Sequence, residues 1–182
     1  MKKIPILLCV VFLLTAAVPV GSVQAQWLKN GKPFDSNYAK TNGKLGGRMV
    51  FVDDNEQLYR EWEQPTEGVS LHEVDTITPN KKISCFIVFS NATPDKKAMA
   101  NVTVKYIVSN PLGTIVQQSP ELEVWQNKPA PEENDLQLSV EFLQIVLNAK
   151  SPLGIYTVNA IVYDAVGDLR LELEKKFKLV NQ

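Results

Sequence analysis

The feature that most constrains how this chain can fold is a series of short apolar runs with a period of two residues. In residues 102–108, valine and tyrosine alternate with Thr103 and Lys105, so one side of an extended segment is expected to face a core. A Pro-Leu-Gly turn lies after this run, in residues 110–113, and a second lies in residues 151–154. Short strands that recur about every 8–12 residues between turns predict a mostly β protein with an antiparallel β-sandwich.

The strand pattern extends over most of the chain. We expect strands at residues 48–52, 69–78, 82–89, 102–108, 114–118, 122–125, 137–147, 155–163 and 169–179. Residues 82–89 are apolar on both faces, which is typical of a central strand in a packed sheet. Residues 137–147 are rich in β-branched and aromatic side chains, and we expect a strand with a bulge there rather than a helix.

One short helix is expected on the N-terminal side of the domain, at residues 54–63. Asp53 and Glu56 have the spacing of a capping box, in which a side-chain oxygen accepts from a free amide of the first turn. Leu58 and Trp62 stand four residues apart and would lie on one helical face.

The N-terminus carries the pattern of a secretory signal peptide. Lys2 and Lys3 precede an apolar stretch at residues 4–18, which is shorter than the roughly 20 residues that a membrane-spanning helix needs. Small residues then predict cleavage between Ala25 and Gln26. The expected organisation is a signal peptide at residues 1–25, an extended N-terminal arm at 26–47 and the sandwich at 48–182. We therefore expect a periplasmic protein, or alternatively a secreted one, with no transmembrane segment after cleavage.

Cysteine content limits the covalent chemistry of the domain. The chain has two cysteines, and Cys9 lies inside the predicted signal peptide. Cys85 alone cannot form an intramolecular disulfide. Its place in an apolar strand predicts a buried, inert thiol rather than a nucleophile or an intermolecular bridge.

Charge and composition do not predict a catalytic or metal site. Lys and Arg number 19 against 20 Asp and Glu, and no basic stripe marks a nucleic-acid surface. His72 is the single histidine, expected on an exposed strand face, and zinc sites need several Cys or His residues. The acidic clusters at residues 53–56 and 132–135 are interpreted as a helix cap and a solvated loop; calcium binding by their clustered oxygen donors is the alternative, although neither matches an EF-hand loop. We predict no catalytic residue, no metal and no cofactor.

Three aromatic residues are the candidate binding residues. Tyr59, Trp62 and Trp125 would form an exposed platform for a sugar or a peptide if their rings reach the surface. The alternative for each ring is burial in the core, and Trp125 is the better candidate because it precedes a proline-rich acidic loop.

The last third of the chain resembles the terminal hairpin of immunoglobulin-like and macroglobulin-like domains in bacterial envelope proteins. The residues that carry this likeness are 152–158, 162–164, 167 and 177–180. A wider set, residues 46–54, 62–65, 88–90, 122–131 and 135–138, is similar to a family of small exported proteobacterial proteins. That resemblance implies compartment and fold, and it brings no activity or site residue. It also implies a loop-closing disulfide in relatives, at positions that Ala92 and Ala100 occupy here.

The predicted function follows from two expectations: a β-sandwich commonly presents binding surfaces, and the sequence predicts no catalytic, metal or cofactor site. We expect a non-enzymatic periplasmic or secreted protein that binds another envelope or extracellular protein through loops or an unpaired sheet edge. A carbohydrate- or small-ligand-binding module that uses the aromatic residues is the first alternative. A carboxylate-dependent hydrolase is the second, and it requires acids that converge in a cleft.

Overall fold

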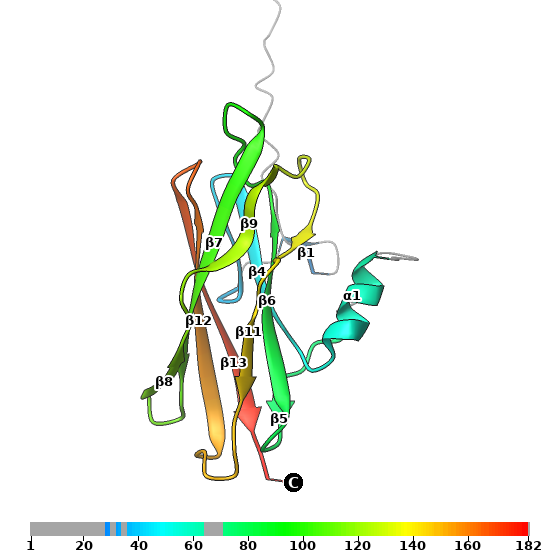
Figure 1. Ribbon diagram of the computed structural model, residues 1–182. Helices are drawn as coiled ribbons and strands as arrows, with labels where there is room; N and C mark the ends of the chain where they lie inside the picture. The colour runs from blue at the N-terminus through cyan, green and yellow to red at the C-terminus, as the bar shows by residue number, and fades with distance from the viewer. Residues whose placement is uncertain (1–27, 30–31, 34–35, 64–70, 182) are drawn as a thin grey trace, which may run out of the picture.

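Two β-sheets packed face to face make up the body of the protein (Figure 1). The computed structural model describes residues 28–29, 32–33, 36–63 and 71–181. The predicted signal peptide and its cleavage site at Ala25 and Gln26 lie outside the described residues. The prediction of a mostly β sandwich with one short helix near its N-terminal side is confirmed.

The first sheet, here called sheet 1, is antiparallel and centred on strand β6. It contains β3 (Ala39–Asn42), β4 (Leu45–Val52), β6 (Lys82–Ser90), β10 (Gln137–Leu138) and β11 (Leu143–Val146). β10 and β11 pair with the same side of β6, and residues 139–142 between them interrupt the strand that we expected with a bulge. Residues 39–47 of the segment that we expected as an arm form β3 and the start of β4.

The second sheet, here called sheet 2, is centred on strands β12 and β7. It contains β5 (Thr76–Ile77), β7 (Met99–Ser109), β8 (Ile115–Gln118), β9 (Leu122–Pro129), β12 (Gly154–Asp164) and β13 (Leu169–Leu179). β8 and β9 pair with different halves of β7. β5 runs parallel to β13, and the other described strand pairs are antiparallel. A separate two-stranded ribbon consists of β1 (Leu28–Lys29) and β2 (Lys32–Pro33).

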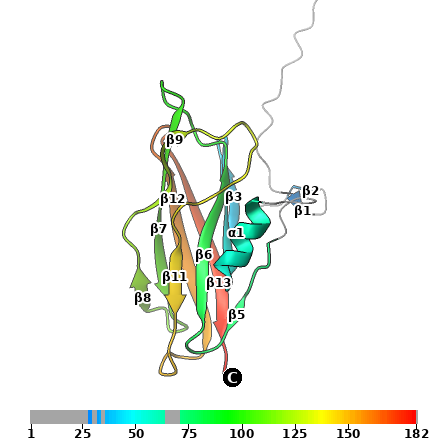
Figure 2. The same ribbon diagram turned by 45° about the vertical axis from the view of Figure 1, so that its right-hand side comes forward.

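Strand β6 is buried on both faces, which explains why its sequence is apolar throughout. Cys85 and Ile87 point into the core between the sheets, while Phe86 and Val88 point outward from sheet 1. Helix α1 (Asn55–Glu63) covers that outward face, where Leu58 is buried (Figures 1 and 2). The predicted central strand is confirmed because the helix supplies the second apolar surface that β6 needs.

The helix is confirmed, but its cap is one residue later than predicted. The backbone N–H of Gln57 donates to Asp54 Oδ1 at 2.9 Å, so Asp54 and not Asp53 caps the first turn. Helical geometry begins at Asn55, which leaves Asp53 exposed before the cap. Consequently Glu56 does not reach back as in a capping box; it pairs instead with Arg60, at 3.9 Å.

The prediction of a strand at residues 69–78 is wrong for most of its length. Val69 lies outside the described residues, and only Thr76–Ile77 form a strand. The backbone N–H of Val74 donates to the Phe51 carbonyl of sheet 1, whereas Ile77 pairs with β13 of sheet 2. The segment crosses from one sheet to the other, so it cannot keep one strand partner. His72 therefore lies in irregular backbone and not in a strand.

Cys85 is confirmed as a buried free thiol. Burial raises the pKa of this thiol strongly, and the nearby positive charge of Lys175 and a hydrogen bond from Tyr106 oppose that effect without reversing it. A thiol that stays protonated is a poor nucleophile, in keeping with the predicted inert role.

Asp164 closes the hairpin between β12 and β13 and ties a distant loop to it. This carboxylate is completely buried. Its Oδ2 accepts from the Thr93 N–H at 2.8 Å, and its Oδ1 accepts from Val166 at 3.1 Å and Gly167 at 3.2 Å. One side chain thus satisfies three backbone donors from two segments that are far apart in the sequence.

We expect Asp164→Ala to lower the free energy of unfolding by about 3 kcal/mol, because it leaves three partly buried backbone amides without their acceptor. Urea unfolding monitored by tryptophan fluorescence measures this change. Asp53→Ala is the matched control, since Asp53 is exposed and its loss should change stability by less than about 0.5 kcal/mol. Equal stability of the two variants would contradict the anchoring role of Asp164.

Candidate functional site

Lys175 occupies an inward-facing position of β13, where the pattern of the strand otherwise places apolar residues. Leu171, Leu173, Phe177 and Leu179 share that face and are buried. The lysine side chain is only 12% exposed, and its ammonium lies 5.0 Å from the ring centroids of both Tyr38 and Phe51. A cation in this place needs compensation, because burial disfavours the charged form.

Glu73 supplies that compensation and is shared by two cations. One carboxylate oxygen accepts from Lys175 Nζ and the other from the Arg48 guanidinium. Lys175 also donates to the Met49 carbonyl at 3.3 Å. Arg48 and Met49 belong to β4, Lys175 belongs to β13, and Glu73 lies on the crossing segment. The cluster of Arg48, Glu73 and Lys175, here called the seam cluster, therefore joins the two sheets at one side of the sandwich.

An open groove runs beside the seam cluster. Its first part has a volume of about 530 Å³ and is lined by Ser36, Asn37, Tyr38, Glu73, Val74, Asp75, Glu174, Lys175 and Lys176. Its second part, of about 370 Å³, is lined by Asn37, Lys40, Asn159, Ala160, Ile161, Arg170, Glu172, Leu173 and Glu174. Asn37 and Glu174 line both parts, and the Glu174 N–H donates to the Asn37 carbonyl at 2.7 Å. The two parts therefore adjoin at Asn37 and Glu174, beside β13, and together they are here called the groove.

The lining of the groove carries both signs of charge in equal number. Its cations are Lys40, Arg170, Lys175 and Lys176, and its anions are Glu73, Asp75, Glu172 and Glu174. Several are paired with one another, such as Arg170 with Glu172 at 2.8 Å and Lys176 with Glu174 at 3.2 Å. Such a lining offers donors and acceptors for hydrogen bonds without the single-sign field that attracts polyanions.

Trp125 lies on β9 and is half-buried rather than fully exposed. Its ring packs against Phe89 with centroids 5.8 Å apart, and Lys128 Nζ lies 5.1 Å from its centroid. The indole N–H donates to the Pro129 carbonyl at 2.9 Å. Much of this ring therefore already has partners within the protein.

Tyr59 and Trp62 lie on α1, on the outward side of sheet 1. Tyr59 is 38% exposed and meets Phe86 edge to face at 5.9 Å, and burial raises the pKa of its phenol. Trp62 is half-buried against the same outward cluster. Since Trp125 packs on the inward face of β6 through Phe89, the three aromatic residues do not form one platform.

His72 lies beside α1 and pairs with acidic and amide side chains. Its Nδ1 lies 2.9 Å from Glu61 Oε1 and 3.2 Å from Gln57 Nε2. The hydrogen bond from Gln57, followed by that from His72, lowers the pKa of the Glu61 carboxyl. The residues lining the small hollow here are Val52, Asp53, Asp54, Gln57, Leu58, Glu61 and His72, and they include no Ser, Thr or Cys nucleophile.

Residues 28–29, 32–33, 36–63 and 71–181 contain no group of three or more His, Cys, Asp or Glu side chains placed to hold a metal ion. No helix among those residues is long and apolar enough to cross a membrane.

The seam cluster was not predicted from the sequence, although the sequence contains a signal for Lys175. The alternation of residues 169–179 assigns Lys175 to the same face as its leucines and phenylalanine, so the pattern itself marked an inward charge. Glu73 as its partner was not predictable from that pattern, because the segment containing Glu73 was expected to form a strand.

No family model and no curated protein matches this chain. Among solved structures it is similar to a family 123 glycoside hydrolase from Clostridium perfringens, with 12% identity, a TM-score of 0.41, and 76% of this chain and 27% of that chain covered. It is also similar to a Niemann-Pick type C2 protein from Japanese carpenter ant, with 11% identity and a TM-score of 0.39; 72% of this chain and 89% of that chain are covered. A third similar structure is the C-terminal domain of wzt, with 8% identity and a TM-score of 0.45; 80% of this chain and 78% of that chain are covered. This chain spans less than two thirds of the glycoside hydrolase, and likenesses at these TM-scores carry no argument about function.

We expect a substitution of Glu73 to lower the stability of the protein more than a substitution of Lys175. Glu73→Gln leaves Arg48 and Lys175 without their shared carboxylate and should lower the free energy of unfolding by about 2 kcal/mol. Lys175→Met leaves Glu73 paired with Arg48 and keeps the apolar stem, so it should cost less than about 1 kcal/mol.

Urea unfolding of both variants and of the double variant measures these costs and the coupling energy between the residues. A larger loss for Lys175→Met than for Glu73→Gln would contradict the shared-carboxylate arrangement.

Proposed function

We propose that this protein is a non-enzymatic binding protein of the periplasm or the extracellular space, and that its groove along β13 binds an extended segment of another protein. The observation that carries the proposal is the groove itself, which is open and whose charged lining residues are four cations and four anions. The location outside the cytoplasm is supported by the lysine-led apolar N-terminus and its expected cleavage site.

The chemistry of the lining favours a polypeptide ligand. A peptide segment presents alternating N–H and C=O groups together with side chains of either charge. The groove offers the amides of Asn37 and Asn159, the carboxylates of Glu172 and Glu174, and the guanidinium of Arg170. A lining with equal numbers of positive and negative side chains, which can also form hydrogen bonds, matches a peptide better than it matches a polyanion or an apolar small molecule.

Rigid strands hold these side chains. Arg170, Glu172 and Glu174 lie on the outward side of β13, and Asn159 lies on the neighbouring β12 in register with Glu174. Asn37 forms the opposite wall through its hydrogen bond to β13. Preformed walls lower the entropic cost of binding a flexible segment.

The aromatic residues favour this proposal over a carbohydrate-binding one. Tyr59, Trp62 and Trp125 lie outside the groove linings given above, and Tyr38 in the groove has the Lys175 ammonium 5.0 Å from its ring. Sugar recognition usually needs an aromatic face that is open to the ligand.

Site-directed photo-crosslinking in the producing cells tests the proposal. A photoreactive amino acid at Glu172 should yield a covalent adduct with a specific protein, because this side chain lines the groove. The same reagent at Gln144, which is exposed on β11 of the other sheet, is the matched control. We also expect Asn159→Tyr, which fills the groove from an outward position, to reduce the Glu172 adduct by about tenfold.

Three outcomes would contradict the proposal. If Glu172 yields no adduct, or if Gln144 yields the same adduct in the same amount, the groove is not the binding surface. Retention of the adduct in Asn159→Tyr, with the variant folded by circular dichroism, would count against it as well.

A further inference from the structure

Two identical turns bring their leucines to the same end of the sandwich. The Pro-Leu-Gly turns between β7 and β8 and before β12 lie at the lower end in Figure 1. Pro111 Cγ lies 3.1 Å from the position that a Cβ on Gly154 would take, so the turns contact one another. Leu112 is 80% exposed and Leu153 is 48% exposed.

This lower end gathers the most exposed large apolar side chains of the described residues. In order of exposure they are Leu112 at 80%, Val146 at 58%, Ile115 at 57%, Ile155 at 55% and Leu153 at 48%. Ile115 pairs with Ser109, whose other neighbour in sheet 2 is Thr157, two residues from Ile155 on the same face. Ile115 and Ile155 thus share the outer face of sheet 2 beside the two leucines, whereas Val146 lies on the outer face of sheet 1. Exposed apolar residues that lie close together mark an interaction surface, whereas scattered ones do not.

The same end is basic. The chain segments that form it, residues 76–83, 109–118, 143–157 and 177–181, contain Lys81, Lys82, Lys150 and Lys178 and no Asp or Glu. All four lysines are exposed, and none forms a salt bridge within the described part of the chain. The nearest acid is Asp75, which is exposed and whose carbonyl accepts from the Lys178 N–H at 2.7 Å.

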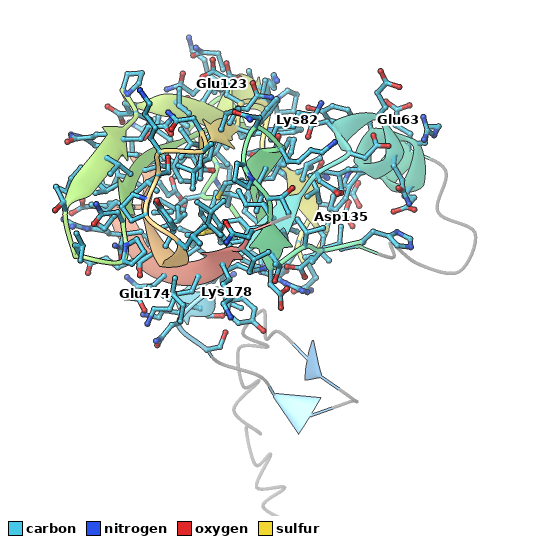
Figure 3. All side chains as sticks on the ribbon, turned by 90° about the horizontal axis from the view of Figure 1, so that it is seen from below. Glu63, Lys82, Glu123, Asp135, Glu174 and Lys178 are labelled. Carbon is cyan, nitrogen blue, oxygen red and sulfur yellow. The ribbon has the colours of Figure 1, made fainter. Side chains whose placement is uncertain are left out.

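Two of these lysines lie next to exposed apolar residues, one in each sheet. Lys82 pairs in register with Val146, and Lys178 pairs in register with Ile155. Figure 3, which shows the molecule from below, places Lys82 and Lys178 on different sides of this end. Protruding leucines with lysines around them form a surface that can face an apolar layer bounded by negative charge.

From this arrangement we propose that the lower end of the sandwich docks on the surface of an anionic phospholipid bilayer. Leu112 and Leu153 enter the boundary between headgroups and acyl chains, and the four lysines contact the lipid phosphates. A second copy of this chain is a poor occupant, because it would oppose four lysines with four more. The inference goes beyond the proposed protein-binding groove, which lies along β13, and would let one molecule hold a partner near a membrane.

Vesicle co-sedimentation of the full chain tests the proposal. Vesicles of phosphatidylcholine with about 30% phosphatidylglycerol should bind the protein, and binding should weaken with added salt and on pure phosphatidylcholine. Leu112→Ser/Leu153→Ser and Lys150→Glu/Lys178→Glu should each reduce the partition coefficient by about tenfold.

Matched controls separate this end from the rest of the chain. Leu136→Ser/Val140→Ser alters side chains that are 47% and 40% exposed elsewhere, and Lys96→Glu/Lys97→Glu reverses two exposed charges in the loop before β7. Both controls should bind as the unaltered protein does. All variants share residues 1–27, so any contribution of that segment to vesicle binding cancels in the comparison.

The proposal is overturned if anionic vesicles do not bind the protein, or if the Leu112 and Lys150 double variants bind as well as their controls. Self-association in analytical ultracentrifugation that disappears in Leu112→Ser/Leu153→Ser, without vesicle binding, would assign this end to a second copy instead. Loss of the groove adduct with vesicle binding intact would count against the groove alone, so the two proposals can fail separately.

Discussion

Burial of β6 on both of its faces is the constraint on which the rest of the structure depends. One face supplies Ile87 and its inward neighbours to the core between the sheets, and the other supplies Phe86 to the cluster beneath α1. Burying an apolar strand completely is favourable only if something covers each side of it. The helix is thus required by the sheet, and the long connection from β4 to β6 that contains it follows from that requirement.

That connection then determines where charge is buried. After α1 the chain must return across the edge of the sandwich, and this crossing places Glu73 between Arg48 of β4 and Lys175 of β13. Desolvation of the three charges offsets much of their attraction, so the net stabilisation is smaller than the number of pairs suggests. They hold the two sheets in one relative position at the side where the groove lies, so the walls of the groove are held by the same contacts.

The two proposed surfaces use different parts of this frame. The groove uses side chains that point outward from β13 and β12, where the alternation of the strand leaves Glu172 and Asn159 facing solvent. The basic and apolar end uses turns, in which Leu112 and Leu153 have no core to enter. A sandwich built from long strands separates such sites in space, so that a partner on one does not obstruct the other.

The sequence by itself determined the period-two strands, the central place of residues 82–90, the helix at 55–63 and the burial of Cys85, because each depends on local pattern and hydrophobicity. It also marked Lys175 as facing inward. Only the tertiary structure decided that Glu73 is its partner, that Trp125 packs on Phe89 away from Tyr59, and that four lysines from separate segments meet at one end. These facts depend on contacts between residues far apart in the chain, and periodicity within a segment carries no information about which distant segment it will meet.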